Sequence, residues 1–110
     1  MSNQITLYID TSNSQVTKVA IIKDGVTSVF EKKTDPATKS QNVLLLIEKA
    51  LNEEGLTLKE ISAIEVNCGP GSFTGTRVGV TVANTLGWVL GIPVNGKKQA
   101  VVTYAESKFD

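Results

Sequence analysis

Histidine does not occur at any position of this 110-residue chain. A Ser-His-Asp triad, a Cys-His pair and an HExxH-type metal site all need an imidazole as base or ligand, so these three kinds of site are excluded. The single cysteine, Cys68, cannot form an intrachain disulfide, which favours a reducing compartment, the cytoplasm. We predict a chain that is not an enzyme: it has no catalytic residue, and alone it binds no metal or cofactor.

Positive charge is also limited. Acidic and basic residues balance at a formal net charge of zero, and Arg77 is the only arginine. Because arginine supplies many protein contacts to phosphates and bases, we expect no direct nucleic-acid binding by this chain alone. The start of the chain lacks a basic segment followed by an apolar run, and polar residues and glycines interrupt its longest weakly charged stretch, 78–96. Neither a signal peptide nor a membrane span is predicted.

The first third of the chain reads as three antiparallel strands. Residues 5–9 alternate between apolar and polar side chains, as in a half-buried strand. Two further strands are expected over 16–23 and 26–33, because Asp24-Gly25 between them is a strong signal for a two-residue hairpin turn.

A helix is expected next. Thr38 and Gln41 match a capping box, and Gly55 suits the left-handed position that ends a helix at about Glu54. At about 100° per residue, Leu45 points away from the apolar face. That face is predicted to consist of Val43, Leu44, Leu46, Ile47, Ala50 and Leu51.

Strands and helices alternate over the rest of the chain. A second capping box, Thr57 with Glu60, precedes a strand over 61–67. A helix from Ser72 to about Leu90, a short strand at Val94-Asn95 and a third helix beginning over 99–106 complete the order. A hairpin-led sheet followed by strand-helix crossovers is the order of the ribonuclease H-like unit of actin-like folds. We therefore predict a mixed α/β lobe as a single domain over residues 1–110.

The segment 67–77 is a glycine-rich junction between a strand and a helix, where N–H groups and the helix dipole can hold an anion. It lacks the lysine of a Walker A loop, and its GxGxxxG spacing does not match the dinucleotide fingerprint. Two interpretations stay open: close packing without a ligand, or an anion or nucleotide site. The residues of the possible site are Gly69, Gly71, Ser72 and Thr74.

Asp10, Thr11 and Ser12 follow the first predicted strand. Actin-like ATPases begin their metal and phosphate site with a carboxylate and hydroxyls at this place, so these residues could extend the nucleotide site. The loop has no glycine to let a phosphate approach, and a plain polar turn is the alternative.

Small residues recur every four positions along the second helix, at Gly75, Gly79, Ala83 and Gly87, and permit another element to approach closely. Packing on the sheet explains this ridge without a partner. The opposite arc is poor in charge and carries an aromatic residue, as interface cores do. Its members are Arg77, Val80, Thr81, Asn84 and Trp88, with Leu45 extending it from the first helix. We predict a protein contact and a homodimer there, with burial of Trp88 in the chain's own core as the alternative.

Several of these segments together resemble the TsaB (YeaZ) family of bacterial tRNA threonylcarbamoyladenosine biosynthesis proteins. The matching segments are Leu7–Ser12 with the hairpin, 56–61 leading into 69–79, and Gly91–Val94. The most specific of them is 69–77, and the resemblance reaches to about Gly96. Family members are longer and carry a second lobe, which we expect to be absent here, and Lys39 stands where relatives often have histidine.

The resemblance implies a non-catalytic scaffold for TsaD, the paralogue that holds metal and ATP and transfers the threonylcarbamoyl group to tRNA. It implies a helix-helix interface formed by 38–54 and 72–90, with the ATPase TsaE in the same complex. ATP and magnesium are accordingly expected on the TsaD-like partner. The alternatives are a nucleotide-binding or phosphotransfer lobe, and a self-associating adaptor unrelated to tRNA.

Overall fold

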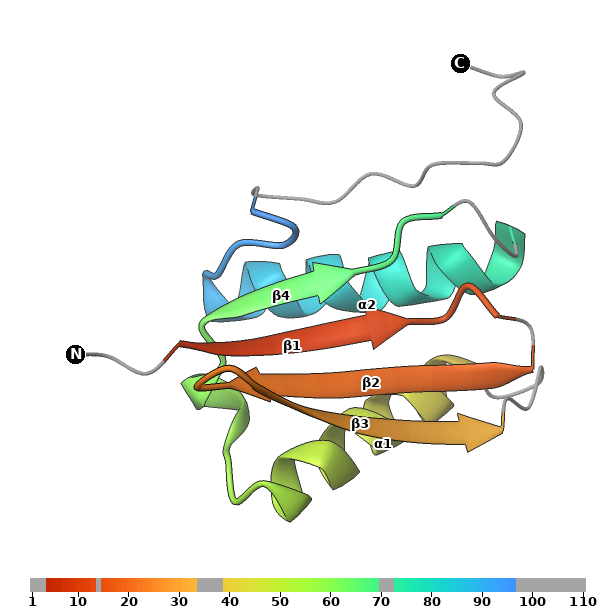
Figure 1. Ribbon diagram of the computed structural model, residues 1–110. Helices are drawn as coiled ribbons and strands as arrows, with labels where there is room; N and C mark the ends of the chain where they lie inside the picture. The colour runs from red at the N-terminus through yellow and green to blue at the C-terminus, as the bar shows by residue number, and fades with distance from the viewer. Residues whose placement is uncertain (1–3, 14, 34–38, 70–72, 97–110) are drawn as a thin grey trace.

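The computed structural model describes residues 4–13, 15–33, 39–69 and 73–96, which form a four-stranded sheet and two long helices (Figure 1). The strands are β1 (Ile5–Asp10), β2 (Val16–Lys23), β3 (Val26–Lys33) and β4 (Ala63–Val66), in the order β3-β2-β1-β4. β2 is antiparallel to both β1 and β3, and β4 runs parallel to β1. The predicted mixed sheet is confirmed.

A tight turn at Asp24-Gly25 joins β2 to β3. Both residues have positive φ angles, 52° and 77°, as the two central positions of a type I′ turn require. The turn places Lys23 opposite Val26 and so fixes the register of the whole hairpin.

Both long helices, α1 (Lys39–Glu53) and α2 (Phe73–Leu90), cover one face of the sheet and lie behind it in Figure 1. Helix α1 packs on β2 and β3, and α2 packs on β4 and β1. None of the described helices is both long and apolar enough to span a bilayer. The residue expected to begin the first capping box, Thr38, lies outside the described residues.

Gly55 ends α1 as predicted, with a φ of 67°. Its N–H donates to the Asn52 carbonyl at 3.2 Å, and the N–H of Leu56 donates to the Leu51 carbonyl at 2.8 Å, which is the Schellman pattern. The second capping box is confirmed, because Glu60 accepts the backbone N–H of Thr57 at 2.8 Å before the short helix η2 (Leu58–Glu60).

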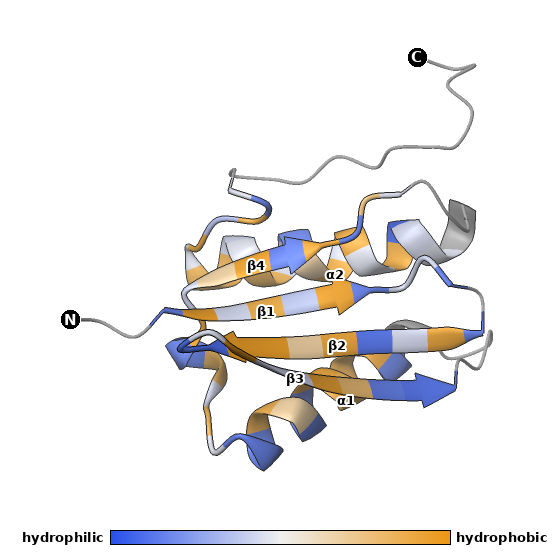
Figure 2. Ribbon diagram, viewed as in Figure 1, coloured by the Kyte–Doolittle hydropathy of each residue, from blue (hydrophilic) through white to orange (hydrophobic). Residues whose placement is uncertain are grey.

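The core lies between the sheet and the two helices. Alternate residues of β1, namely Ile5, Leu7 and Ile9, are buried on the helix side, and apolar side chains from every other element join them. Figure 2 shows hydrophobic residues distributed over all the strands and both long helices. The predicted apolar face of α1 is correct except for Leu44, whose side chain is 50% exposed. Leu44 lies at the margin of that face and turns toward α2, as described below.

The outer edge of β4 is closed in an unexpected way. Val94 forms an isolated parallel bridge with Ile64, so the predicted short strand is reduced to a single residue pair. The side chain of Asn95 replaces the next peptide group of a strand. Its Oδ1 accepts the N–H of Val66 at 2.8 Å, and its Nδ2 donates to the Val66 carbonyl at 3.0 Å. The third helix expected over 99–106 lies outside the described residues.

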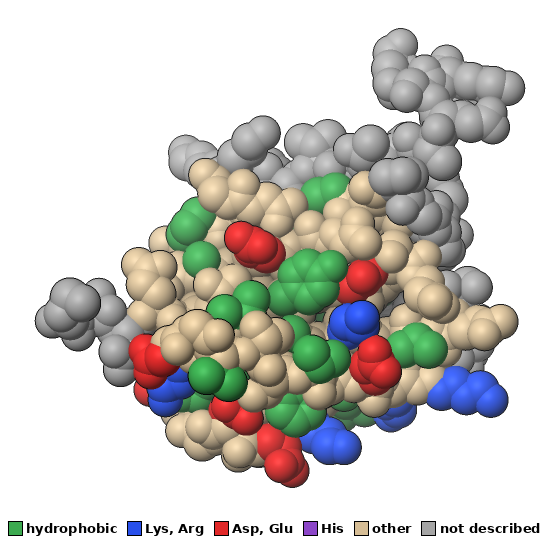
Figure 3. Space-filling model, in the orientation of Figure 1, with side chains coloured by type: hydrophobic (Ala, Val, Ile, Leu, Met, Phe, Trp, Pro, Cys, Tyr) green, Lys and Arg blue, Asp and Glu red, His purple; other side chains and the backbone are tan. Residues whose placement is uncertain are grey.

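No described helix covers the other face of the sheet, which Figure 3 shows from the front. Tyr8, Ala20 and Val29 lie opposite one another across β1, β2 and β3. Hydrophobic side chains gather at the middle of this face, with acidic and basic side chains around them.

Candidate functional site

The carboxyl ends of the parallel neighbours β1 and β4 bring Asp10, Ser12 and Asn67 together. Asp10 Oδ1 accepts hydrogen bonds from the backbone N–H of Ser12 at 2.9 Å and from its hydroxyl at 2.6 Å. Asn67 Nδ2 donates to Ser12 Oγ at 3.1 Å. The Tyr8 hydroxyl donates to the second carboxylate oxygen of Asp10 at 3.4 Å. These contacts join the two loops into one polar cluster.

Neither titratable side chain of the cluster, Asp10 or Tyr8, has a pKa near neutral pH. Burial alone would raise the pKa of Asp10, but hydrogen bonds from Ser12, Asn67 and Tyr8 outweigh it, and the pKa lies below its usual value. Burial, followed by the nearby Asp10 carboxylate, raises the pKa of Tyr8. Asp10 is therefore ionised and Tyr8 protonated at neutral pH, and neither is poised to exchange protons there.

Thr11 points the opposite way, into the interior, and its side chain is 0% exposed. Its hydroxyl donates to the Gly75 carbonyl and accepts the N–H of Gly79 at 3.0 Å. In a regular helix these two groups, four residues apart, bond to each other. The hydroxyl thus contacts both backbone groups of one turn of α2. Thr11 anchors α2 to the end of β1, and its buried hydroxyl is engaged by the backbone of that helix.

The ridge of small residues on α2 faces the chain's own sheet. A Cβ at Gly79 would overlap Thr11 Oγ1, and a Cβ at Gly87 would overlap Val94 Cγ2. Close packing within the chain therefore explains these two positions, as the simpler interpretation of the ridge predicted.

Only the first part of the glycine-rich junction is described. Gly69 has a φ of 109°, and its N–H donates to Asn67 Oδ1 at 2.9 Å, which links it to the polar cluster. Gly71 and Ser72 lie outside the described residues, and of Thr74 only the backbone, in the first turn of α2, is described. No group of three or more cysteine, aspartate or glutamate side chains within the described residues could hold a metal.

The outward side of α2 is exposed, as the sequence predicted. Trp88 is 84% exposed, which excludes its burial in the chain's own core, and Arg77 and Thr81 are also exposed, with Asn84 partly so. Val80 contradicts the prediction, because it is 4% exposed and belongs to the core. It lies about 100° around the helix from the sheet-facing Gly79, at the margin of the buried arc.

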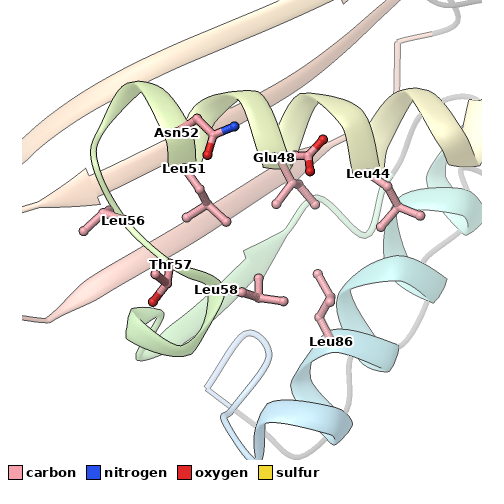
Figure 4. A pocket seen from close by; sticks show the side chains of 9 residues that line it. Leu44, Glu48, Leu51, Asn52, Leu56, Thr57, Leu58 and Leu86 are labelled. Carbon is pink, nitrogen blue, oxygen red and sulfur yellow. The ribbon is translucent and has the colours of Figure 1, made fainter.

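A groove of ≈ 360 Å³ separates α1 from α2 (Figure 4). Leu44 and Leu51 enter it from α1, Leu58 from η2 and Leu86 from α2, so its lining is mainly aliphatic. The sequence prediction missed Leu44 and Leu86 as surface residues. Both belong to apolar helical patterns, and only the position of the neighbouring helix shows that they lie at the surface.

Leu45, which was predicted to extend the α2 surface, is exposed but lies elsewhere. It lines a separate hollow with Glu31, Lys32, Leu46 and Lys49, between α1 and β3. Leu44, and not Leu45, is therefore the residue of α1 that borders α2.

Known proteins resemble this chain over most of its length. Residues 33–103 match the family model of TsaD, tRNA N6-adenosine threonylcarbamoyltransferase. The TsaB protein of Bacillus subtilis is 36% identical over 81% of this chain and 38% of its own length. Escherichia coli TsaB is 35% identical over 82% of this chain and 38% of its own length. The chain thus spans less than half the length of these relatives.

A solved structure gives the same result. YeaZ from Pseudomonas aeruginosa matches with a TM-score of 0.75 and 31% identity, over 83% of this chain and 42% of that protein. Its fold is of the ribonuclease H-like and actin-like kind, so the predicted fold class is confirmed. The chain belongs to the TsaB (YeaZ) family, whose characterised members are named as tRNA threonylcarbamoyladenosine biosynthesis proteins.

Proposed function

We propose that this chain is a non-catalytic subunit in tRNA threonylcarbamoyladenosine biosynthesis, and that it binds a TsaD-type threonylcarbamoyltransferase through α1 and α2. The names of its relatives support the pathway, and the match to the TsaD model supports a partner built on a related lobe. The observation that carries the proposal is the set of exposed apolar side chains on the two helices, Leu44 on α1 and Trp88 and Val89 on α2.

We define the helix face as Leu44, Leu86, Trp88 and Val89. Trp88 and Val89 are largely exposed on α2, and Leu44 and Leu86 line the groove between the two helices. Trp88 lies about 200° around α2 from Leu86, so these residues form two apolar parts and not one continuous patch. Burying apolar surface stabilises a complex by roughly 25 cal/mol per Å², and tryptophan is among the residues that most often dominate interface energies. The groove between α1 and α2 suits an aliphatic side chain from a partner helix.

Polar side chains surround the helix face. Arg77, Thr81 and Asn84 lie on the same arc of α2 as Trp88, and Glu48 and Asn52 of α1 line the groove, so polar side chains accompany both apolar parts, as at the rim of an interface. This composition favours a protein partner over a nucleic acid.

The polar cluster around Asp10 supports a non-catalytic role. Hydrogen bonds within the protein engage Asp10, and neither Asp10 nor Tyr8 titrates near neutral pH. In the proposed assembly the TsaD-type subunit holds ATP and magnesium and performs the transfer. A TsaE-type ATPase joins the same complex, which works in the cytoplasm.

Co-purification tests the proposed partnership. The chain is expressed with a tagged TsaD-type protein from the same genome, and we expect the two to elute together. Trp88→Glu should weaken the complex at least tenfold, because it places a charge in the interface core. The control Lys59→Glu on η2 reverses an exposed charge and should leave binding unchanged. A wild-type chain that never binds the TsaD-type protein would sink the partnership.

Hydrolysis of ATP tests the non-catalytic part of the proposal. The purified chain should release no phosphate from ATP above background. Turnover that Asp10→Ala abolishes would contradict the proposal and favour the alternative of a phosphotransfer lobe.

A further inference from the structure

β3 is the outermost strand of the sheet, and no described residue pairs with its outer edge. Lys23 and Val26 flank the two-residue turn and form a hydrogen-bonded pair, and such pairs recur at every second position of the ladder. The backbone groups that point away from β2 are those of Thr27, Val29, Glu31 and Lys33. This edge contrasts with that of β4, where Asn95 occupies the backbone groups of Val66.

One flank of the β3 edge carries an exposed valine. Val29 is 54% exposed and lies beside Ala20 on the face of the sheet that no described helix covers. A strand added to this edge would place every second side chain on that face, next to Val29. β-Branched side chains fit this position, because cross-strand pairs of such residues stabilise a sheet.

The other flank combines an aliphatic floor with positive charge. A hollow of ≈ 340 Å³ lies there, lined by Leu45, Leu46, Glu31, Lys32 and Lys49. Lys32 shares this side with Phe30, which packs against the core. Glu31 belongs to the opposite side and pairs with Lys18 at 3.7 Å. Lys32 and Lys49 form no ion pair within the described part of the chain.

We propose that the outer edge of β3 binds an extended acidic peptide segment of a partner protein by strand addition. The glutamates of the segment face the helix side, where their methylene groups lie over Leu45 and their carboxylates meet Lys32 and Lys49. Its intervening β-branched residues lie beside Val29. Backbone hydrogen bonds supply affinity, and the two flanks supply specificity.

A second copy of β3 does not fit this description. Its side chains on the helix side are Val26, Ser28, Phe30 and Lys32, which include no carboxylate to meet the lysines. The site lies on the β3 flank of the molecule and does not use the helix face, so it is independent of the proposed function.

The test uses an end-capped peptide of four alternating valine-glutamate pairs, labelled for fluorescence anisotropy. One control has the same composition with four valines followed by four glutamates, and another replaces each glutamate by lysine. We expect only the alternating acidic peptide to bind the wild-type chain. If the lysines merely protect the edge from unwanted pairing, that peptide will bind no better than its controls, and the proposal is wrong.

Protein variants then locate the binding. Lys32→Glu with Lys49→Glu should weaken the peptide complex at least tenfold, whereas Lys59→Glu should not. Val29→Pro removes an outward N–H that an edge strand can lose without losing a bond to β2. It should weaken binding more than Val29→Ala, which removes only the side-chain contact, with circular dichroism to compare the folds. Equal binding by the lysine variants overturns the proposal, as does a change from dimer to monomer caused by Val29→Pro.

Discussion

Thr11 and Gly79 are separated by 68 positions in the sequence and joined by a 3.0 Å hydrogen bond in the structure. The sequence showed that Gly79 belongs to a ridge of small residues, and it placed Thr11 in a polar loop. It could not show that the hydroxyl bonds to the backbone of α2, because that contact depends on how closely β1 and α2 approach.

Adding a methyl group at Gly79 tests this contact. Gly79→Ala should lower the free energy of unfolding by about 1–3 kcal/mol, because its Cβ would overlap the Thr11 hydroxyl. Urea unfolding measures the change, and Thr81→Ala on the exposed side of α2 is the control. Thr11→Ala should relieve the overlap, so the double variant should be more stable than the two single effects predict. Strictly additive effects would show that the two residues do not interact.

The Asp10 carboxylate makes stability depend on pH. Its pKa is lower in the folded chain than the unfolded value of about 3.9, so the ionised form stabilises the fold. That contribution is complete well above the unfolded pKa and is lost as pH falls through the folded pKa. The stability difference between wild type and Asp10→Asn should therefore be constant near neutral pH and shrink below about pH 4. Urea unfolding across this range measures it, and a difference that does not vary with pH contradicts the assignment.

At the scale of elements, sequence patterns located both long helices but not every residue on their faces. The pattern placed Trp88 outside, and the structure agrees, whereas it also placed Val80 there, and Val80 is buried. A residue near the margin of an apolar arc is covered only if a neighbouring element lies beside it. The same reason explains why Leu44 lies beside α2 and Leu45 beside β3.

The end of the sheet shows a different limit of sequence patterns. The prediction of a strand at Val94-Asn95 recognised that the chain returns to β4 there. Asn95 has a φ of 53°, and its side-chain amide bonds to Val66 in place of a backbone peptide. A pattern of apolar residues cannot predict that a side-chain amide will take the place of a backbone peptide. The contact forms only because the folded chain brings Asn95 next to β4.

Glutamate substitutions can distinguish the buried side of α2 from its exposed side. Val80→Glu should unfold the chain or lower its stability by several kcal/mol, because the carboxylate would be buried without a partner. Trp88→Glu should change the free energy of unfolding by no more than about 0.5 kcal/mol, since its side chain is exposed. Thermal and urea unfolding compare the two. Similar losses from both substitutions would mean that the described orientation of α2 is wrong.

At the scale of the whole molecule, the order of elements was sufficient to predict the sheet and its fold class. Three antiparallel strands followed by strand-helix crossovers leave few topologies, because crossovers between parallel strands are almost always right-handed. The sequence also indicated a partner surface, but it could not separate the groove beside α2 from the hollow beside β3. Both contain leucines of α1, and only the packed structure assigns Leu44 to one and Leu45 to the other.

The helix face gives a last prediction, that the chain forms a two-fold dimer when its TsaD-type partner is absent. Exposed apolar surface of this kind is usually covered, and a two-fold pair is the commonest closed arrangement for identical chains. Sedimentation equilibrium should show a dimer at high micromolar concentration and a folded monomer for Trp88→Glu. Leu45→Glu is the matched control, because Leu45 is exposed but lies in the separate hollow, and it should still dimerise.

The dimer and the proposed complex would use the same surface, so they should compete. Adding the TsaD-type protein should convert the dimer into a one-to-one complex, with the apparent affinity falling as the concentration of the chain rises. A chain that stays monomeric at high micromolar concentration contradicts the predicted dimer. A dimer that binds the TsaD-type protein without dissociating shows that the homodimer and the complex use different surfaces. The helix face would then serve only one of these two contacts.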